Sequence, residues 1–310
     1  MSKITTALKL LKHDRSNFFA ALLEKIGSTL PDKLYLQMIF RLKMGYKLNL
    51  KNPRSYSEKL QWLKLYHRDP VYTRLVDKFA VKKWVAERIG EEYVIPTLGI
   101  WNNANEIDFD KLPNQFVLKT TNGGGGGDVI ICKDKSKLDK EKAVVHLNKG
   151  LKKDIYKKLR EWPYKNVPPR VIAEKYMEDE SGELRDYKFF CFNGCVKCIQ
   201  VDYDRFVEHH RNIYDTEWNL LPFSIKYPSK KNVVILKPKN FDIMLTIAEL
   251  LSKNIPHVRV DLYNVNGRIY FGELTFYHGS GHEIFNPKEW DYTFGEWLQL
   301  PSKYKAECAK

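Results

Sequence analysis

Two acidic residues on neighbouring predicted strands are the strongest candidates for chemistry. Asp261 lies within residues 258–265 and Glu273 within residues 268–276, and Asn266-Gly267 between these strands is a typical hairpin turn. Two carboxylates on paired strands suit Mg²⁺, a hard cation that binds one or two carboxylates together with water and phosphate oxygens. Because apolar residues alternate with both acids, we prefer this metal site to a solvated polar face.

The register of that hairpin decides whether the two acids meet. A strict two-residue turn places Asp261 and Glu273 on opposite faces. A three-residue loop over 265–267 instead places Arg259 opposite Glu273, with Asp261 as the diagonal neighbour on the same face. The metal site therefore requires the three-residue loop.

Lys119 and the five glycines 123–127 form a second candidate site. Residues 116–118 are typical of a short buried strand, and a second strand is expected over 129–132. A hairpin needs only one or two glycines, whereas a loop that lays backbone N–H groups along a polyphosphate can use all five. The run is not a P-loop, because no Gly-Lys-Ser/Thr follows and the next element is a strand. A merely flexible hairpin loop is the alternative.

Residues 172–177 form a third pattern, a strand that ends in Glu174-Lys175-Tyr176-Met177. Such a strand can offer backbone N–H and C=O groups to the edge of an adenine. Glu178 or Glu180 could then bind the ribose hydroxyls. Any edge strand could share this pattern, so it has little weight alone.

The composition is that of a globular chain with unevenly distributed charge. The 310 residues are 43% hydrophobic and 29% charged, which suits one large or two smaller domains and argues against disorder. We expect neither a transmembrane helix nor a secretory signal. The first 90 residues hold 19 Lys or Arg and 7 Asp or Glu, against 33 and 31 in the rest. That basic region is either a solvated surface or a contact for an anionic partner.

The five cysteines favour free thiols in a reducing cytosol, because the set is odd and sparse for a long chain. Cys195 and Cys198 have the spacing of half a zinc site. However, Asn193-Gly194 predicts a hairpin in which these two cysteines point to opposite faces of one strand. Metal or redox use of the pair is therefore the minor alternative.

Apolar spacing predicts that the first 90 residues are helical and that the rest is mixed. The expected helices cover 4–26, 31–45, 57–66 with Ser57 as N-cap, 71–89, 139–160 and 241–252. The first is either a core helix or a basic amphipathic surface helix. The region from 91 onward is predicted to contain antiparallel hairpins. The expected units are a helical region over 1–90 and a body over 91–310, with a glycine-loop subdomain over about 91–170 and a metal and hinge subdomain over about 171–300.

The order of these motifs resembles that of the ATP-grasp fold. Lys78, Lys119 with the glycine run, the strand ending at Met177, and Arg259-x-Asp261 followed by Glu273-x-Thr275 occur in the order of that family. Several local strings resemble its TupA-like branch, namely residues 57–64, 186–189, 192–194, 204–205 and 273–276. The resemblance covers about residues 35–300.

The resemblance implies an α+β fold in which two subdomains sandwich ATP, with a helical N-terminal region. ATP would phosphorylate a carboxylate, and an amine would attack the acyl phosphate to give an amide. Asp261 and Glu273 would hold Mg²⁺, while Arg259 and Lys188 would act on the transferred phosphoryl group. The nucleotide-binding residues implied are Lys78, Lys119, Gly123, Gly124, Gly125, Gly126, Gly127, Glu174, Lys175, Tyr176, Met177, Glu178 and Glu180.

This sequence departs from the common ATP-grasp pattern at two places. Thr275 stands where an Asn usually provides a third metal ligand, and the N-terminal region is helical rather than βαβ. Arg205, His278 and Ser280 are candidate substrate contacts, the last two because a glycine-rich loop follows the metal strand directly. His209-His210-Arg211 could bind an anionic substrate, although a surface loop is the preferred interpretation.

The leading functional hypothesis is a carboxylate–amine ligase that depends on ATP and Mg²⁺. The TupA-like resemblance implies bacterial capsule, exopolysaccharide or other envelope polymer synthesis, for example an amino acid joined to a uronic acid. The expected location is the cytoplasm, with contact to acidic polysaccharide or to the inner membrane face. One alternative is a glycosyltransferase of the same pathway, which would release no ADP. The other is a non-catalytic basic module that binds membrane. Only the net charge would favour nucleic acid as its ligand, so we do not expect nucleic acid as a partner.

Overall fold

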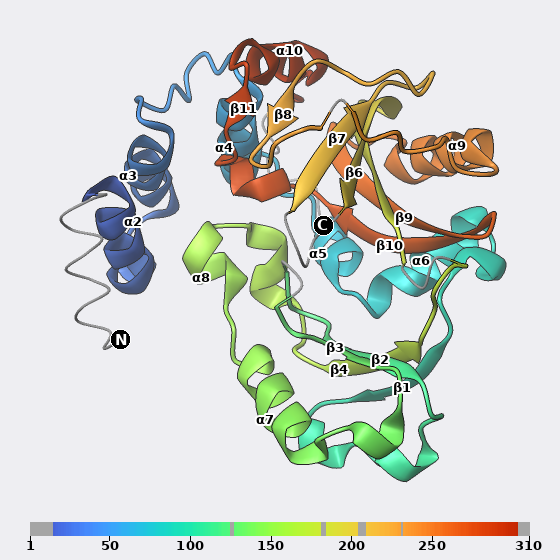
Figure 1. Cartoon of the computed structure of the whole chain (residues 1–310). Coiled ribbons are helices and arrows are strands. Elements are labelled where there is room, and N and C mark those ends of the chain that lie inside the picture. Colours follow the sequence, from blue (N-terminus) through green and yellow to red (C-terminus); the bar gives the residue numbers. More distant parts are fainter. Residues whose placement is uncertain (1–14, 125–126, 181–183, 204–208, 231, 303–310) are drawn as a thin grey trace.

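The computed structural model describes residues 15–124, 127–180, 184–203, 209–230 and 232–302. Two antiparallel sheets face each other in this part of the chain, and helices α5 and α6 lie at one side between them (Figure 1). The described residues do not include the predicted loop glycines Gly125 and Gly126 or the candidate substrate residue Arg205. They also do not include Cys308 or residues 1–14.

The four-stranded sheet carries the start of the glycine loop. Its strands are ordered β1-β4-β2-β3. Their bounds are β1 Thr97–Trp101, β2 Phe116–Thr120, β3 Val129–Cys132 and β4 Val171–Lys175. Phe116 and Leu118 point to one face and pack with Leu147 of α7 (Lys140–Leu151). Because side chains alternate along a strand, Val117 and Lys119 lie on the other face, which is turned toward the five-stranded sheet.

The five-stranded sheet carries the predicted metal residues. Its strands are ordered β10-β9-β5-β6-β7. Their bounds are β5 Asp186–Phe192, β6 Cys195–Tyr203, β7 His210–Tyr214, β9 His257–Val265 and β10 Arg268–Thr275. Phe189 and Val260 face α9 (Phe241–Ser252), which covers one side of the sheet. Cys195 is exposed and Cys198 is buried. The register shifts between Phe190 and Cys191, so Cys195 lies opposite Phe192 and Cys198 opposite Phe190. The two cysteines therefore share a face, and the prediction that they point to opposite faces was wrong.

The helices before residue 90 divide between two of the hydrophobic cores. Helices α2 (Arg15–Ile26) and α3 (Asp32–Met44) form a small core of their own. Helices α4 (Tyr56–Tyr66), α5 (Val71–Val76) and α6 (Ala80–Ile89) share the large core of the five-stranded sheet. The helical N-terminal region is thus confirmed where it is described. The division at residue 90 stays a prediction.

Two of the predicted helix boundaries were wrong. Ser55, not Ser57, caps α4, because its side chain accepts from the Glu58 N–H while Glu58 bonds back to the cap in a capping box. The helix predicted over 71–89 is broken at 77–79, where the Asp77 carboxylate accepts from the N–H groups of Phe79 and Ala80. The break frees Lys78 to point into the site described below.

The remaining elements complete the covering of the large core. The predicted helix 139–160 is two helices, α7 and α8 (Ile155–Leu159), joined through Asp154, which caps α8. The short strands β8 (Ser224–Ile225) and β11 (Phe285–Asn286) pair near α10 (Glu289–Trp297). Within the described residues, no helix is both long and apolar enough to span a membrane.

Candidate active site

A β-bulge brings the two predicted metal carboxylates together. The turn at Asn266-Gly267 has two residues, with Arg268 opposite Val265, so the predicted three-residue loop was wrong. The register shifts between Phe271 and Glu273, which places Glu273 directly opposite Asp261. Gly272 is the extra residue, and the acids share a face because the bulge reverses the alternation that the turn imposes.

Arg259 lies between these acids. Its Nε and Nη2 donate to the Asp261 carboxylate at 2.7 and 2.6 Å, and Nη2 is 3.5 Å from Glu273 Oε1 and 3.1 Å from Thr275 Oγ1. The carboxylates in turn raise the pKa of Arg259 above its ordinary value, against the effect of burial. Arg259 thus provides positive charge where β9 and β10 present their acids.

Lys78 connects this carboxylate site to the glycine loop. Its Nζ donates to the Gly123 carbonyl and lies 3.8 Å from Glu273 Oε2. Its backbone N–H donates to the Thr121 carbonyl at 3.3 Å, which fixes the segment between α5 and α6 against the end of β2. Burial opposes ionisation of Glu273, but Lys78 and Arg259 together lower its pKa. The ammonium group of Lys78 therefore lies between the glycine loop that follows β2 and the acid on β10.

Lys119 forms the second basic group of the site. Its Nζ lies 2.5 Å from Glu174 Oε2, and Lys82 Nζ lies 2.6 Å from Oε1 of the same carboxylate. Burial alone would raise the pKa of Glu174, but the two lysines lower it. Lys82 was missed in the sequence, because a lysine on an amphipathic helix normally faces solvent. The only feature of the sequence that pointed to Lys82 is its spacing of about one helical turn from Lys78.

The inner face of the four-stranded sheet is apolar beside Lys119. Val129 pairs with Lys119 and Ile131 with Val117, so both β3 residues lie on this face. They are 37% and 57% exposed, so the edge strand β3 leaves an open apolar surface on this face. Tyr263 lies on β9 two residues after Asp261, and burial raises its pKa, with Asp186, Glu273 and Glu174 adding to the rise. A flat apolar ring would cover this surface.

Residues 175–180 lead from the first sheet to the second. The Lys175 N–H donates to the Pro96 carbonyl at 3.1 Å, so this donor is already used. Glu178 is bound by Tyr176 at 2.5 Å and Lys133 at 3.2 Å, and the Glu180 N–H donates to the side chain of Asn266. Met177 and Glu180 lie on this connection, as an adenine and ribose site requires, but their contacts to nucleotide remain predictions.

Lys188 lies next to the carboxylate site on β5, opposite Asp261. It contacts the carboxylate of Asp186, and its Nζ is 3.4 Å from Asp202 Oδ2. Arg211 Nε donates to the other oxygen of Asp202 at 2.8 Å. Residues 210 and 211 are therefore buried in strand β7, and the surface loop predicted there was wrong.

His278 and Ser280 are brought close to the site but are buried. His278 Nδ1 is 2.7 Å from Arg259 Nη1, and the Ser280 hydroxyl accepts from Lys64 at 2.7 Å. Their exposures are 3% and 6%. Lys64 was another residue that the sequence did not single out, since it lies on a helix among apolar neighbours.

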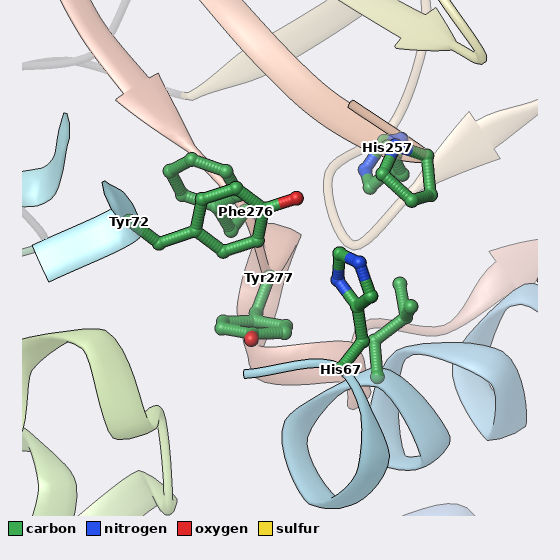
Figure 2. Close-up of a pocket in the computed structure, with 7 residues that line it drawn as sticks. His67, Tyr72, His257, Phe276 and Tyr277 are labelled. Atoms are coloured by element: carbon green, nitrogen blue, oxygen red, sulfur yellow. The ribbon is translucent and has the colours of Figure 1, made fainter. Parts of the chain in front are cut away.

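A small internal cavity lies apart from these residues. Figure 2 shows His67, Tyr72, His257, Phe276 and Tyr277 around it. Its free space is about 10 Å³, which is room for about one water molecule and not for a substrate.

The donor set at β9 and β10 fits Mg²⁺. All candidate ligand atoms are oxygens, from Asp261, Glu273 and the Thr275 hydroxyl, and hard cations prefer oxygen. Glu273 is the most open of these, with a side chain that is 39% exposed. Thr275 Oγ1 already accepts from Arg259, so it is a weaker candidate than the two acids.

A family model described as TupA-like ATPgrasp matches residues 58–299. The chain belongs to the TupA-like ATP-grasp family. This assignment confirms the predicted fold, with its two α+β subdomains, and the predicted class of ATP-grasp ligase. It also supports ATP as the nucleotide of this site.

Solved structures that resemble this TupA-like protein are distant. D-alanine–D-alanine ligase from Helicobacter pylori has a TM-score of 0.45 and 15% identity, over 79% of this chain and 69% of that one. The corresponding ligase from Bacillus anthracis has a TM-score of 0.38 and 18% identity, over 65% and 57%. D-Alanyl-alanine synthetase A from Vibrio cholerae has a TM-score of 0.39 and 11% identity, over 80% and 64%. This chain spans less than two thirds of the last two. A search of curated proteins found no sequence match.

Proposed function

We propose that this protein joins a carboxylate to an amine in a reaction driven by ATP, through an acyl phosphate. One observation supports this most strongly. Lys78 contacts the Gly123 carbonyl at the start of the glycine loop and lies 3.8 Å from Glu273. A phosphate-binding loop and a pair of metal-type carboxylates thus meet at one cation, as phosphoryl transfer requires.

The phosphate groups of ATP bind along the basic side of this site. Lys119 binds the α- and β-phosphates, and the glycine loop covers the β- and γ-phosphates with backbone N–H groups. When ATP is present, its charge attracts Lys119 while Lys82 keeps Glu174 neutralised. Because two lysines contact Glu174, one of them can move to the phosphates while the other still compensates the buried carboxylate.

The adenine lies on the apolar inner face of the four-stranded sheet. Val129 and Ile131 supply the exposed apolar surface, and the chain from Lys175 to Met177 supplies backbone groups for its edge. Glu178 or Glu180 binds the ribose. This placement would cover the apolar side chains that the edge strand β3 leaves exposed.

Asp261 and Glu273 hold Mg²⁺, with Thr275 as a weaker third ligand. The metal supplies charge neutralisation at the phosphates. Arg259 donates to the transferred phosphoryl group, and Lys188 supports the same negative charge from the next strand.

The reaction has two balanced steps. A carboxylate oxygen of the first substrate attacks the γ-phosphorus, the bond to the ADP oxygen breaks, and ADP leaves. The amine nitrogen of the second substrate then attacks the acyl carbon, the bond to the phosphate oxygen breaks, and the nitrogen loses a proton to the departing phosphate or to water, which leaves the amide.

The substrate is an acidic envelope precursor such as a uronic acid, and the amine is an amino acid. The basic first 90 residues support an anionic partner, and helix α2 adds an exposed apolar face of Phe19, Leu22 and Ile26. These residues are spaced three and four apart, so they lie on one side of the helix. Basic and apolar groups together suit the inner membrane face, where a lipid-linked precursor is found.

Hydroxylamine trapping tests the reaction class. The protein is incubated with ATP, MgCl₂, hydroxylamine and a panel of uronic acids and amino acids, and ADP and hydroxamate are measured. We expect hydroxamate in step with ADP for one carboxylate class, since hydroxylamine captures acyl phosphates. Release of ADP without hydroxamate or amide from any of the carboxylates would contradict the proposal.

A further inference from the structure

His278 contacts the terminal nitrogen of Arg259 that the acids leave free. Its Nδ1 lies 2.7 Å from Arg259 Nη1. Because a guanidinium can only donate, Nδ1 accepts this hydrogen bond and the proton of the neutral imidazole lies on Nε2. Nε2 lies 2.9 Å from Glu283 Oε2, a close contact whose angle is not that of a hydrogen bond. Burial also lowers the pKa of His278 to about 4, which keeps the ring neutral.

Glu283 is itself fixed from two sides. Arg211 Nη1 lies 3.1 Å from its Oε2, and Lys226 Nζ lies 3.3 Å from its Oε1. The contacts therefore run without interruption from Arg259 through His278 and Glu283 to Arg211. In this series Arg259 donates to His278 and Arg211 donates to Glu283, while His278 and Glu283 are in close contact.

The backbone that carries His278 is held in an unusual conformation. Gly279, Ser280 and Gly281 have φ values of 53°, 56° and 70°. A left-handed serine costs about 1–2 kcal/mol, so the turn needs outside support. Helix α4 provides it, because Gln61 Nε2 donates to the Ser280 carbonyl at 3.0 Å and Lys64 Nζ to the same carbonyl at 2.9 Å. Residues 57–64, which resemble the family, thus support this turn.

The partners of Arg259 leave one donor for a ligand. In the described part of the chain, Asp261 takes one hydrogen from Nε and one from Nη2, Thr275 and Glu273 share the second on Nη2, and His278 takes one from Nη1. The second Nη1 hydrogen has no partner among these residues. The bond to His278 fixes its direction, because both Nη1 hydrogens lie in the guanidinium plane.

We propose that His278 is a positioning residue, which orients Arg259 so that its remaining Nη1 hydrogen meets the transferred phosphoryl group. This inference rests on the proposed ligase activity for its catalytic consequence. It assigns His278 a different role from the substrate contact predicted from sequence. Both ring nitrogens of His278 are engaged by protein groups, and the side chain is 3% exposed. 

Three variants separate positioning from general stability. His278→Phe keeps the volume and removes both contacts, while His278→Gln keeps one acceptor and one donor. His257→Phe is the matched control, because His257 on β9 is also a buried histidine, and its ring nitrogens contact Tyr56 Oη at 2.8 Å and the Cys191 carbonyl at 2.9 Å. Kinetics of ADP formation and melting temperature are measured for each.

We expect His278→Phe to lower kcat by about tenfold or more with a KM for ATP within about twofold of wild type. His278→Gln should recover part of kcat, and His257→Phe should lose stability but not kcat. Equal kcat losses in the two phenylalanine variants, or no loss in His278→Phe, would overturn the proposal.

A spectroscopic readout keeps the proposal testable if no ligase activity is found. The NMR signal of the Arg259 Nε–H is assigned by its loss in Arg259→Lys. It should shift and exchange faster with water in His278→Phe but stay as in wild type in His257→Phe. An unchanged signal in His278→Phe would show that His278 does not position Arg259, whereas absent ADP formation in wild type would contradict the ligase alone.

Discussion

Glu174 organises the phosphate side of the site at the scale of single residues. It is 4% exposed and has a lysine on each oxygen. A buried carboxylate with one lysine would be left partly uncompensated when that lysine turned to a ligand. With two, the site can bind ATP through Lys119 and keep Glu174 ionised through Lys82. The two lysines therefore have different roles despite their similar contacts.

Lys119→Met and Lys82→Met test this difference. Lys119→Met should weaken binding of a non-hydrolysable ATP analogue by about tenfold or more, because a charge-assisted contact to phosphate is lost. Lys82→Met should mainly lower stability, since Lys82 also donates to the Ile95 carbonyl at 2.6 Å and secures α6. Calorimetric titration and thermal melts distinguish the two. The assignment of Lys119 fails if its variant binds the analogue as tightly as wild type.

The residue types at the site could be read from sequence better than their partners could. Asp261 and Glu273 were identified because charges within apolar alternation need a reason, and Lys119 because a glycine run follows it. Lys82, Lys64 and the environment of His278 were not, because their partners come from distant segments. The contact between Lys64 and Ser280 joins residues 216 positions apart, which local spacing does not encode.

At the scale of elements, the bulge at Gly272 determines the geometry of the metal pair. The two-residue turn alone would place the side chains of Glu273 and Asp261 on opposite faces. The bulge shifts the register by one residue, so that Glu273 lies opposite Asp261 on the same face. A Cβ at position 272 would lie 3.0 Å from the Asp261 carbonyl and 3.2 Å from the ring of Tyr263. The chain therefore needs a residue without a side chain where β10 approaches β9 most closely.

Gly272→Ala should disturb this register. We expect a stability loss of about 1–3 kcal/mol by denaturant unfolding, because the crowded atoms belong to the backbone and an aromatic ring. Activity should fall further than stability explains, since the acids no longer face each other. Gly45→Ala is the control, because it strains a left-handed residue with nothing within 4 Å and lies outside the site. Equal activity in both variants would show that the bulge does not serve the metal pair.

Most elements followed from local pattern, and the exceptions have local causes. The helix at 241–252 and the positions of both Asn-Gly turns were predicted correctly, whereas the registers of the two hairpins were not. The break at Asp77 was not, because Asp is tolerated in a helix unless its side chain caps the next turn. The bulge at Gly272 was not predicted, because a glycine within a strand is compatible with several structural features. The turn residues are also compatible with two different loops.

At the scale of the whole molecule, α2 and α3 form a unit fixed to the glycine-loop side. Arg160, only 1% exposed, donates to the carbonyls of Gly27, Ser28 and Leu30, and the Tyr35 hydroxyl donates to the Lys158 carbonyl at 2.6 Å. The unit also presents the apolar face of α2 to solvent, with Ile26 66% exposed. When the apolar face of α2 binds a membrane surface, this arrangement would hold the ATP site at a fixed distance from that surface.

Vesicle binding tests the role of this face. The triple variant Phe19→Ser, Leu22→Ser, Ile26→Ser should reduce co-sedimentation with vesicles of anionic phospholipid by about tenfold, since it removes most of the apolar insertion. It should fold as wild type, because all three side chains are exposed. Acidic polysaccharide is tested in parallel at low and physiological salt. If wild type binds neither surface, the proposed partner is wrong.

Binding of an ATP analogue with and without Mg²⁺ tests the central claim most directly, because it needs no knowledge of the substrates. Wild type should bind AMP-PNP at least about tenfold more tightly with Mg²⁺ than without it. Glu273→Gln, which removes one charge without changing shape, should abolish that difference, whereas the exposed control Glu296→Gln should retain it. The account is contradicted if wild type shows no Mg²⁺-dependent binding, or if Glu273→Gln binds the analogue with the same Mg²⁺ dependence as wild type.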